Sequence, residues 1–169
     1  HFELANGKRC NFTVIQKDCL DVKGRMNSYN SNIGGWDVAP RRAWCNTTYR
    51  NALPAELKPA FKLFKVRASD GAGSNSYESL DYFTFASEVE VFGFSKYSNA
   101  TAESSSKQLD YYKESQGKAV KKIGSQNAWY WLRSSRDSGD YAYCVVNAYG
   151  GADYNNANGT GGLAPIGCI

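Results

Sequence analysis

Five residue types are missing from a long stretch near the C-terminal end of the sequence. Residues 134–162, SSRDSGDYAYCVVNAYGGADYNNANGTGG, contain no Lys, Glu, Gln, Met or Trp. The same five types fill 28 of the other 140 positions, so about six would be expected in this window. Loops rich in Gly, Asn and Ser are biased in composition, but an ordinary solvated loop keeps some Lys and Glu. The absence of these five residue types therefore needs a specific explanation.

Other absences exclude several classes of protein. No apolar run approaches the roughly 18 residues of a membrane-spanning helix. The single His is His1 and no CxxC pair occurs, so no zinc site is expected. There is no signal peptide and no initiating Met, so we expect a trimmed fragment that lacks its targeting segment. The five cysteines are Cys10, Cys19, Cys45, Cys144 and Cys168. Their long spacings along the sequence favour small buried thiols over disulfides.

What the sequence does contain is typical of one globular domain. Its 169 residues suffice for a substantial core and are few for two domains. The apolar content of 42% and charged content of 21% are globular values, and tyrosines make up half of the aromatic residues. The net charge of +4 is spread along the chain, apart from Lys118, Lys121 and Lys122. Without a basic stripe, nucleic-acid binding is not expected.

The order of the expected elements favours an α+β fold, with helices early and strands late. Asp37 is expected to cap a helix with Pro40 in its first turn. Ser87 and Glu90 form the pattern of a capping box. A second helical turn is expected from Pro54, and another helix over Ser106 to Ser115. Strands are expected at 11–20, 61–68, 81–86, 129–133 and 163–169.

Several short motifs carry a resemblance to a known family. In order they are GGWDVAPRRAWCN, ALPAEL, ASEVEVFG, WYWLRS and GGLAPIGCI. This series resembles a bacterial and phage family with the motifs GGW, RxWCN, WWLRS and a C-terminal GVAP. Members include variable proteins of diversity-generating retroelements, distant relatives of the phage major tropism determinant. The resemblance implies a C-type-lectin-like fold over residues 1–169, a single domain with an antiparallel sheet and two to three helices.

The resemblance also implies a cause for the missing residue types. Such elements mutate template adenines, mostly in AAY codons, in the 3′ end of the gene. Randomising the first two bases of AAY cannot produce Lys, Glu, Gln, Met or Trp, the five types absent from residues 134–162. The window lies where the family places its hypervariable region. The other interpretation is a Gly- and Asn-rich loop in a relative that is not diversified.

Matching the window to the family pattern divides it into two sets. The fixed positions are small or apolar for the most part, as a core lining should be: Arg133, Ser134, Cys144, Val146, Gly150, Ala152, Ala157, Gly162, Ala164 and Pro165. The variable positions are the expected ligand-binding residues, and should form one solvent-exposed surface: Arg136, Ser138, Gly139, Tyr141, Ala142, Val145, Asn147, Ala148, Tyr149, Gly151, Asp153, Tyr154, Asn155, Asn156, Gly159 and Gly161. Alternation in YAYCVVN puts Ala142 on the inward face instead.

The function implied is binding, without a cofactor, metal ion or catalytic residue. The partner would be a protein or other macromolecule on a host or neighbouring cell, met from a phage tail or a bacterial surface. Tyr gives large contact area at low entropic cost, so Tyr141, Tyr149 and Tyr154 are candidate hot spots. Arg136 and Asp153 would add charge selectivity. Each Tyr has a structural alternative, folding back onto Trp129 or Trp131.

Two other functions stay open at this point. Formylglycine-generating enzymes share the broad fold, but here no cysteine has an obvious base or metal ligand beside it. A calcium-dependent lectin would need a carboxylate-rich loop such as Glu-Pro-Asn, which is missing. Calcium-independent glycan binding remains the main alternative.

Overall fold

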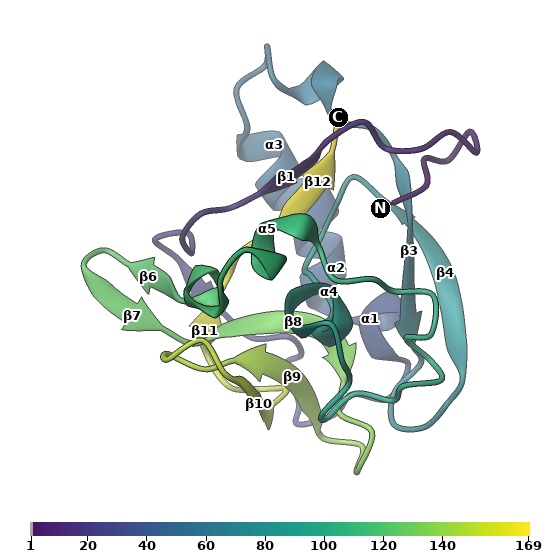
Figure 1. Cartoon of the computed structure of the whole chain (residues 1–169), viewed down its shortest axis with the longest axis vertical. Coiled ribbons are helices and arrows are strands. Elements are labelled where there is room, and N and C mark those ends of the chain that lie inside the picture. The colour runs from purple at the N-terminus through teal and green to yellow at the C-terminus, as the bar shows by residue number, and fades with distance from the viewer. Residues whose placement is uncertain (1) are drawn as a thin grey trace.

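The computed structural model describes residues 2–169, apart from the side chain of Gln116, and shows a mixed α+β fold (Figure 1). Small, mainly antiparallel sheets carry most of the structure, and short helices pack around them. No helix of this part of the chain has the length and apolarity to cross a membrane.

A five-stranded sheet contains all the strands of the compositionally biased window. Its strand order is β10-β9-β8-β11-β2, so β10 lies at an edge. The pairing of β11 with β8 is parallel, and the other pairings are antiparallel. Its strands are β2 (Lys23–Gly24), β8 (Tyr130–Ser135), β9 (Ala142–Val146), β10 (Ala152–Asn156) and β11 (Gly161–Gly162).

The two ends of the chain meet in a second sheet. β1 (Thr13–Ile15) pairs antiparallel with β12 (Ile166–Cys168), which also pairs with β5 (Phe83–Thr84). Figure 1 shows β1 running alongside β12. A disulfide joins Cys10 to Cys168. The preference for free thiols was therefore wrong for this pair, because strand pairing brings two cysteines 158 positions apart into contact.

Two hairpins complete the strands. β3 (Phe64–Ser69) confirms the strand expected at 61–68, and pairs with β4 (Ser76–Asp81). β6 (Lys121–Ile123) pairs with β7 (Gln126–Ala128). The strand β4 was not predicted, because its sequence SYESLD is polar and only Ser79 and Asp81 in it are buried.

Helical structure is divided into more and shorter segments than the two to three helices expected. Asp37 is not a cap: Gly34, with a φ of 81°, precedes the first helix, and Ala39 precedes Pro40 in the second. The expected helix at 106–115 is limited to its last part. The segments are α1 (Gly35–Val38), α2 (Pro40–Trp44), the π-helical η1 (Cys45–Tyr49), α3 (Arg50–Ala52), η2 (Lys58–Ala60), α4 (Glu88–Phe92), α5 (Asp110–Lys113) and η3 (Gln116–Ala119).

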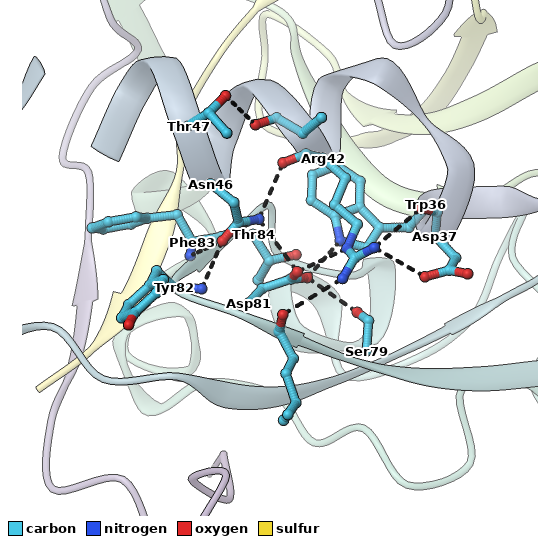
Figure 2. A network of polar contacts seen from close by, with 12 residues as sticks. Trp36, Asp37, Arg42, Asn46, Thr47, Ser79, Asp81, Tyr82, Phe83 and Thr84 are labelled. Carbon is cyan, nitrogen blue, oxygen red and sulfur yellow. Dashed lines mark hydrogen bonds and ion pairs between the residues drawn. The ribbon is translucent and has the colours of Figure 1, made fainter. Parts of the chain in front are cut away.

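Two of the motifs converge on one buried carboxylate (Figure 2). Asp81 accepts hydrogen bonds from Trp36 Nε1 at 3.0 Å, Arg42 Nε at 2.7 Å and Asn46 Nδ2 at 3.2 Å. Asn46 Oδ1 in turn accepts from the main-chain N–H groups of Tyr82 and Phe83. The GGW and RxWCN motifs therefore join the helices of residues 35–52 to the end of β4.

The four tryptophans are not equally buried. Trp36 and Trp131 are fully buried, whereas Trp44 and Trp129 are only half-buried. Trp129 and Trp131 share one side of the chain, with ring centroids 5.0 Å apart. Trp131 Nε1 donates to the Gly24 carbonyl at 2.8 Å, which ties β8 to β2 across the sheet.

Strand β9 has core on both sides. Tyr143 and Val145 belong to one apolar cluster, together with Trp36 and Trp131. Cys144 and Val146 belong to the other cluster. The predicted alternation is therefore correct, but neither face of β9 is exposed to solvent.

Candidate functional site

The window separates into buried and accessible positions largely as its fixed and variable sets predict. All fixed positions are buried except Ala152, which is half-buried. Most variable positions are accessible, and Tyr149 is 89% exposed. Three variable positions are buried: Ala142, Val145 and Gly161. Their assignment to a ligand-binding surface was wrong.

The reasons for these three corrections are local. Ala142 and Val145 lie in β9, between the two apolar clusters. A Cβ atom on Gly161 would lie 2.2 Å from the ring of Trp129, so no side chain fits there. Substitution is also restricted at Gly139. This residue is exposed, but its φ of 105° is a conformation that favours glycine.

The accessible residues do not form the single surface that was expected. Successive residues of a strand point to opposite faces, so Tyr154 and Asn156 lie on one face of β10, and Asp153 and Asn155 on the other. The side chains of Asp153 and Asn155 accept hydrogen bonds from the N–H groups of the residues that follow them. A single continuous surface of variable residues is therefore limited to the face of β10 that carries Tyr154.

Arg136 is the centre of an aromatic cluster on that face. Its guanidinium carbon lies 3.7 Å from the ring centroid of Tyr154 and 5.4 Å from that of Tyr141. It also donates a hydrogen bond to the Tyr141 hydroxyl. Tyr154 packs edge-on against Tyr97, with centroids 5.0 Å apart. These tyrosines thus fold onto Arg136 and Tyr97, and not onto Trp129 or Trp131.

Tyr97 comes from outside the window and was not predicted. Its loop is organised by the buried carboxylate of Glu88, which accepts from the main-chain N–H groups of Lys96, Tyr97 and Ser98 at 2.8–3.0 Å. Glu88 belongs to the α4 segment, whose predicted capping box between Ser87 and Glu90 is confirmed. The segment SEVE therefore positions a loop that contacts the window.

A groove continues the same surface toward the turn between β9 and β10. Its volume is about 610 Å³. Its lining includes Phe92, Phe94 and Lys96, together with the variable residues Asn147 and Gly151. Phe94 is 54% exposed. We call the groove together with Arg136, Tyr141, Tyr154 and Tyr97 the variable face.

Comparison with known proteins places the chain in a family. Residues 11–169 match the family model described as "Domain of unknown function (DUF6273)". The chain belongs to the DUF6273 family. No curated protein and no solved structure matches it.

In this DUF6273 chain, hydrogen bonds to main-chain carbonyls of the window hold it against the rest of the domain. The side-chain amide of buried Asn32 donates to the carbonyls of Arg136, Gly139 and Ala142, at 3.3, 3.1 and 2.7 Å. The N–H groups of Met26 and Asn27 both donate to the Ala157 carbonyl at 3.0 Å. Main-chain acceptors are present whatever the side chain, so these bonds do not depend on residue identity in the window. Asn32 lies in a turn-like segment and carries no signal that predicts this role.

Arg133 and Ser134 mark the start of the window and are held by acidic partners. Arg133 forms a bidentate, fully buried ion pair with Glu90, with contacts of 2.5 and 2.6 Å. Ser134 donates to Glu103 and accepts from the N–H of Glu88. The two motifs SEVE and WYWLRS thus contact each other directly.

The remaining cysteines are buried, and their thiols are kept protonated. Burial raises the pKa of the Cys19 thiol to about 11, and also raises the pKa values of Cys45 and Cys144. A thiolate, not a thiol, is the nucleophile and the metal ligand in cysteine chemistry. Within residues 2–169, no group of three or more His, Cys, Asp or Glu side chains is arranged to hold a metal ion.

Proposed function

We propose that this DUF6273 domain is a ligand-binding module of C-type-lectin-like fold. In this proposal its C-terminal window is diversified by adenine-directed mutagenesis of a retroelement. The ligand is a protein or other macromolecule on a host or neighbouring cell, bound from a phage tail or a bacterial surface. The observation that carries the proposal is the main-chain fastening of the window, together with the burial of its fixed positions.

The chemistry of the variable face supports a binding role. Tyr141 and Tyr154 present large, rigid rings, and Arg136 lies between them with its charge unpaired by any carboxylate among the described ion pairs. Tyr and Arg are the residues most often found at binding hot spots. The alternative of an enzyme with a cysteine nucleophile has less support, because all three free thiols are buried with raised pKa values.

The pairing of the first and last strands supports the fold part of the proposal. It closes the domain with β1 and β12 side by side, while the window lies in a separate sheet. The strand pairing that joins the two chain ends therefore lies in a different sheet from the proposed variable surface.

The genomic neighbourhood tests diversification directly. We expect a reverse transcriptase gene and a template repeat nearly identical to the codons for 134–162, with mismatches confined to template adenines. The absence of both would refute diversification. It would leave a calcium-independent glycan-binding domain as the alternative.

Binding is tested with surface extracts and arrayed glycans. Tyr154→Ala and Tyr149→Ala are expected to weaken binding of the captured ligand by about 1–2 kcal/mol where the residue is a hot spot. Tyr29→Ala is the matched control, because Tyr29 is 72% exposed and lies outside the window. Equal losses in the window and control variants would place the ligand elsewhere, and saturable glycan binding without a protein ligand would favour the glycan alternative.

A further inference from the structure

A second hollow lies at the other edge of the five-stranded sheet, far along the strand order from β10. It has a volume of about 480 Å³ and is formed between β2 and the start of α2. Three cationic residues line it, Lys23, Arg25 and Arg41, and no acidic residue is among its lining. Ser28 and Thr160 are also among its lining and carry hydroxyl groups.

Arg41 is held in a fixed position in this hollow. Its Nε donates to the Arg25 carbonyl at 2.8 Å, and its guanidinium carbon lies 4.9 Å from the ring centroid of Trp44. The guanidinium also occupies the space over Gly24, where a Cβ atom would lie 2.1 Å from Nη2. Gly24 is therefore needed to admit the arginine. Trp44 in turn stacks on Tyr49 of η1, with centroids 5.8 Å apart, which supports the Trp44 ring.

The charge of Arg41 has no counterpart in the described structure. Its partners are a carbonyl and an aromatic ring, and none of the described ion pairs includes Arg41, Lys23 or Arg25. Burial lowers the pKa of the Arg41 guanidinium, which reports incomplete solvation of the charge. A partly buried charge without a partner is unfavourable. An anion in the hollow would remove that penalty.

We propose that Lys23, Arg25 and Arg41 form a binding site for a sulfate or phosphate ester group. Arg41 presents two Nη groups in a planar fork that suits two oxygens of one anion. Lys23 and Arg25 are exposed and add charge on the β2 side. The site is independent of the variable face, because none of the sixteen variable positions lines it.

The test is isothermal titration of the whole domain with inorganic sulfate and inorganic phosphate at constant ionic strength. Saturable binding at one site is expected, and Arg41→Gln is expected to weaken it at least about tenfold. Lys23→Gln and Arg25→Gln should weaken anion binding several-fold. These two variants test the site if Arg41→Gln does not fold. Lys122→Gln removes the same charge from an exposed residue outside the hollow and should bind like the wild type.

Two further arms separate the sources of the anion. Glucose 6-sulfate and glucose 6-phosphate present the two esters on one sugar, so a difference in affinity identifies the preferred group. The proposal is overturned if no saturable binding occurs. It is also overturned if Arg41→Gln, Lys23→Gln and Arg25→Gln all bind like the wild type, or if Lys122→Gln weakens binding as much as they do.

Discussion

At the scale of single residues, Trp131 joins the core to the sheet. It is fully buried, and its Nε1 group is paired with the Gly24 carbonyl. Trp131→Ala is expected to lower the free energy of unfolding by about 3–5 kcal/mol, through lost burial and the cavity left behind. Urea unfolding measures this loss. The half-buried Trp129 is the matched control, and Trp129→Ala should cost less. An equal loss in both variants would contradict the burial argument.

The buried carboxyl group of Glu103 makes stability depend on pH. Burial raises the pKa of Glu103 above the ordinary value of 4.5. Hydrogen bonds from Ser134 and Val89 lower this pKa, but the effect of burial is larger. A raised pKa means that the folded state holds the proton more tightly than the unfolded state. The contribution of Glu103 to stability is therefore present below about pH 4.5 and is lost as pH rises through the folded-state pKa.

Glu103→Gln removes this titration. The difference in free energy of unfolding between variant and wild type should shift in favour of the variant as pH rises from 4 to 7. Chemical denaturation at several pH values measures the shift. Glu56→Gln, at an exposed position, is the matched control. A difference for Glu103→Gln that does not change with pH would refute the assignment.

At the scale of elements, one side chain from elsewhere makes several hydrogen bonds to the segment that joins β8 to β9. Asn32→Ala removes the donor to the carbonyls of Arg136, Gly139 and Ala142, the last at the start of β9. Loss of these bonds in a buried place is expected to cost at least about 2 kcal/mol. Amide hydrogen exchange should also increase in residues 136–142. Asn27→Ala removes one bond to the Ser31 carbonyl and serves as the control. Unchanged exchange in the loop of the Asn32 variant would show that the loop is held by other contacts.

The elements also show how far the sequence predicts the structure. The strands around residues 64–69 and 130–135 and the capping box were predictable, because apolar patterning and cap residues are local signals. β4 was missed because it is polar and gains its place by pairing with β3. The Asp37 cap was wrong because Gly34 supplies the φ of 81° that begins α1, and the Asp37 carboxylate pairs with Arg42 instead.

The candidate site was predictable in part for a similar reason. Composition located the window, but burial of Ala142, Val145 and Gly161 depends on which strands become central. A polar or small residue type does not reveal that its strand has core on both sides. The contributions of Tyr97 and Asn32 arise from contacts more than 50 positions away in the chain, and no local pattern signals them.

At the scale of the whole molecule, the scaffold should fold independently of the side chains it displays. A library randomised at the accessible variable positions other than glycine tests this: Arg136, Ser138, Tyr141, Asn147, Ala148, Tyr149, Asp153, Tyr154, Asn155 and Asn156. Replacing Tyr149, Tyr154, Asn155 or Asn156 by Ala or Ser is expected to shift the free energy of unfolding by less than about 0.5 kcal/mol each, the usual range for surface substitutions. Most members should therefore resist proteolysis like the wild type.

A second library, randomised at Ala142, Val145 and Gly161, is the matched control. Larger side chains at these buried positions overpack the core or collide with Trp129, and typical costs are about 1–3 kcal/mol each. Few members should survive the same proteolysis, although fewer positions are changed. If both libraries lost the fold equally, residues of the window would be part of the scaffold, and a surface that changes while the domain persists would be ruled out for this molecule.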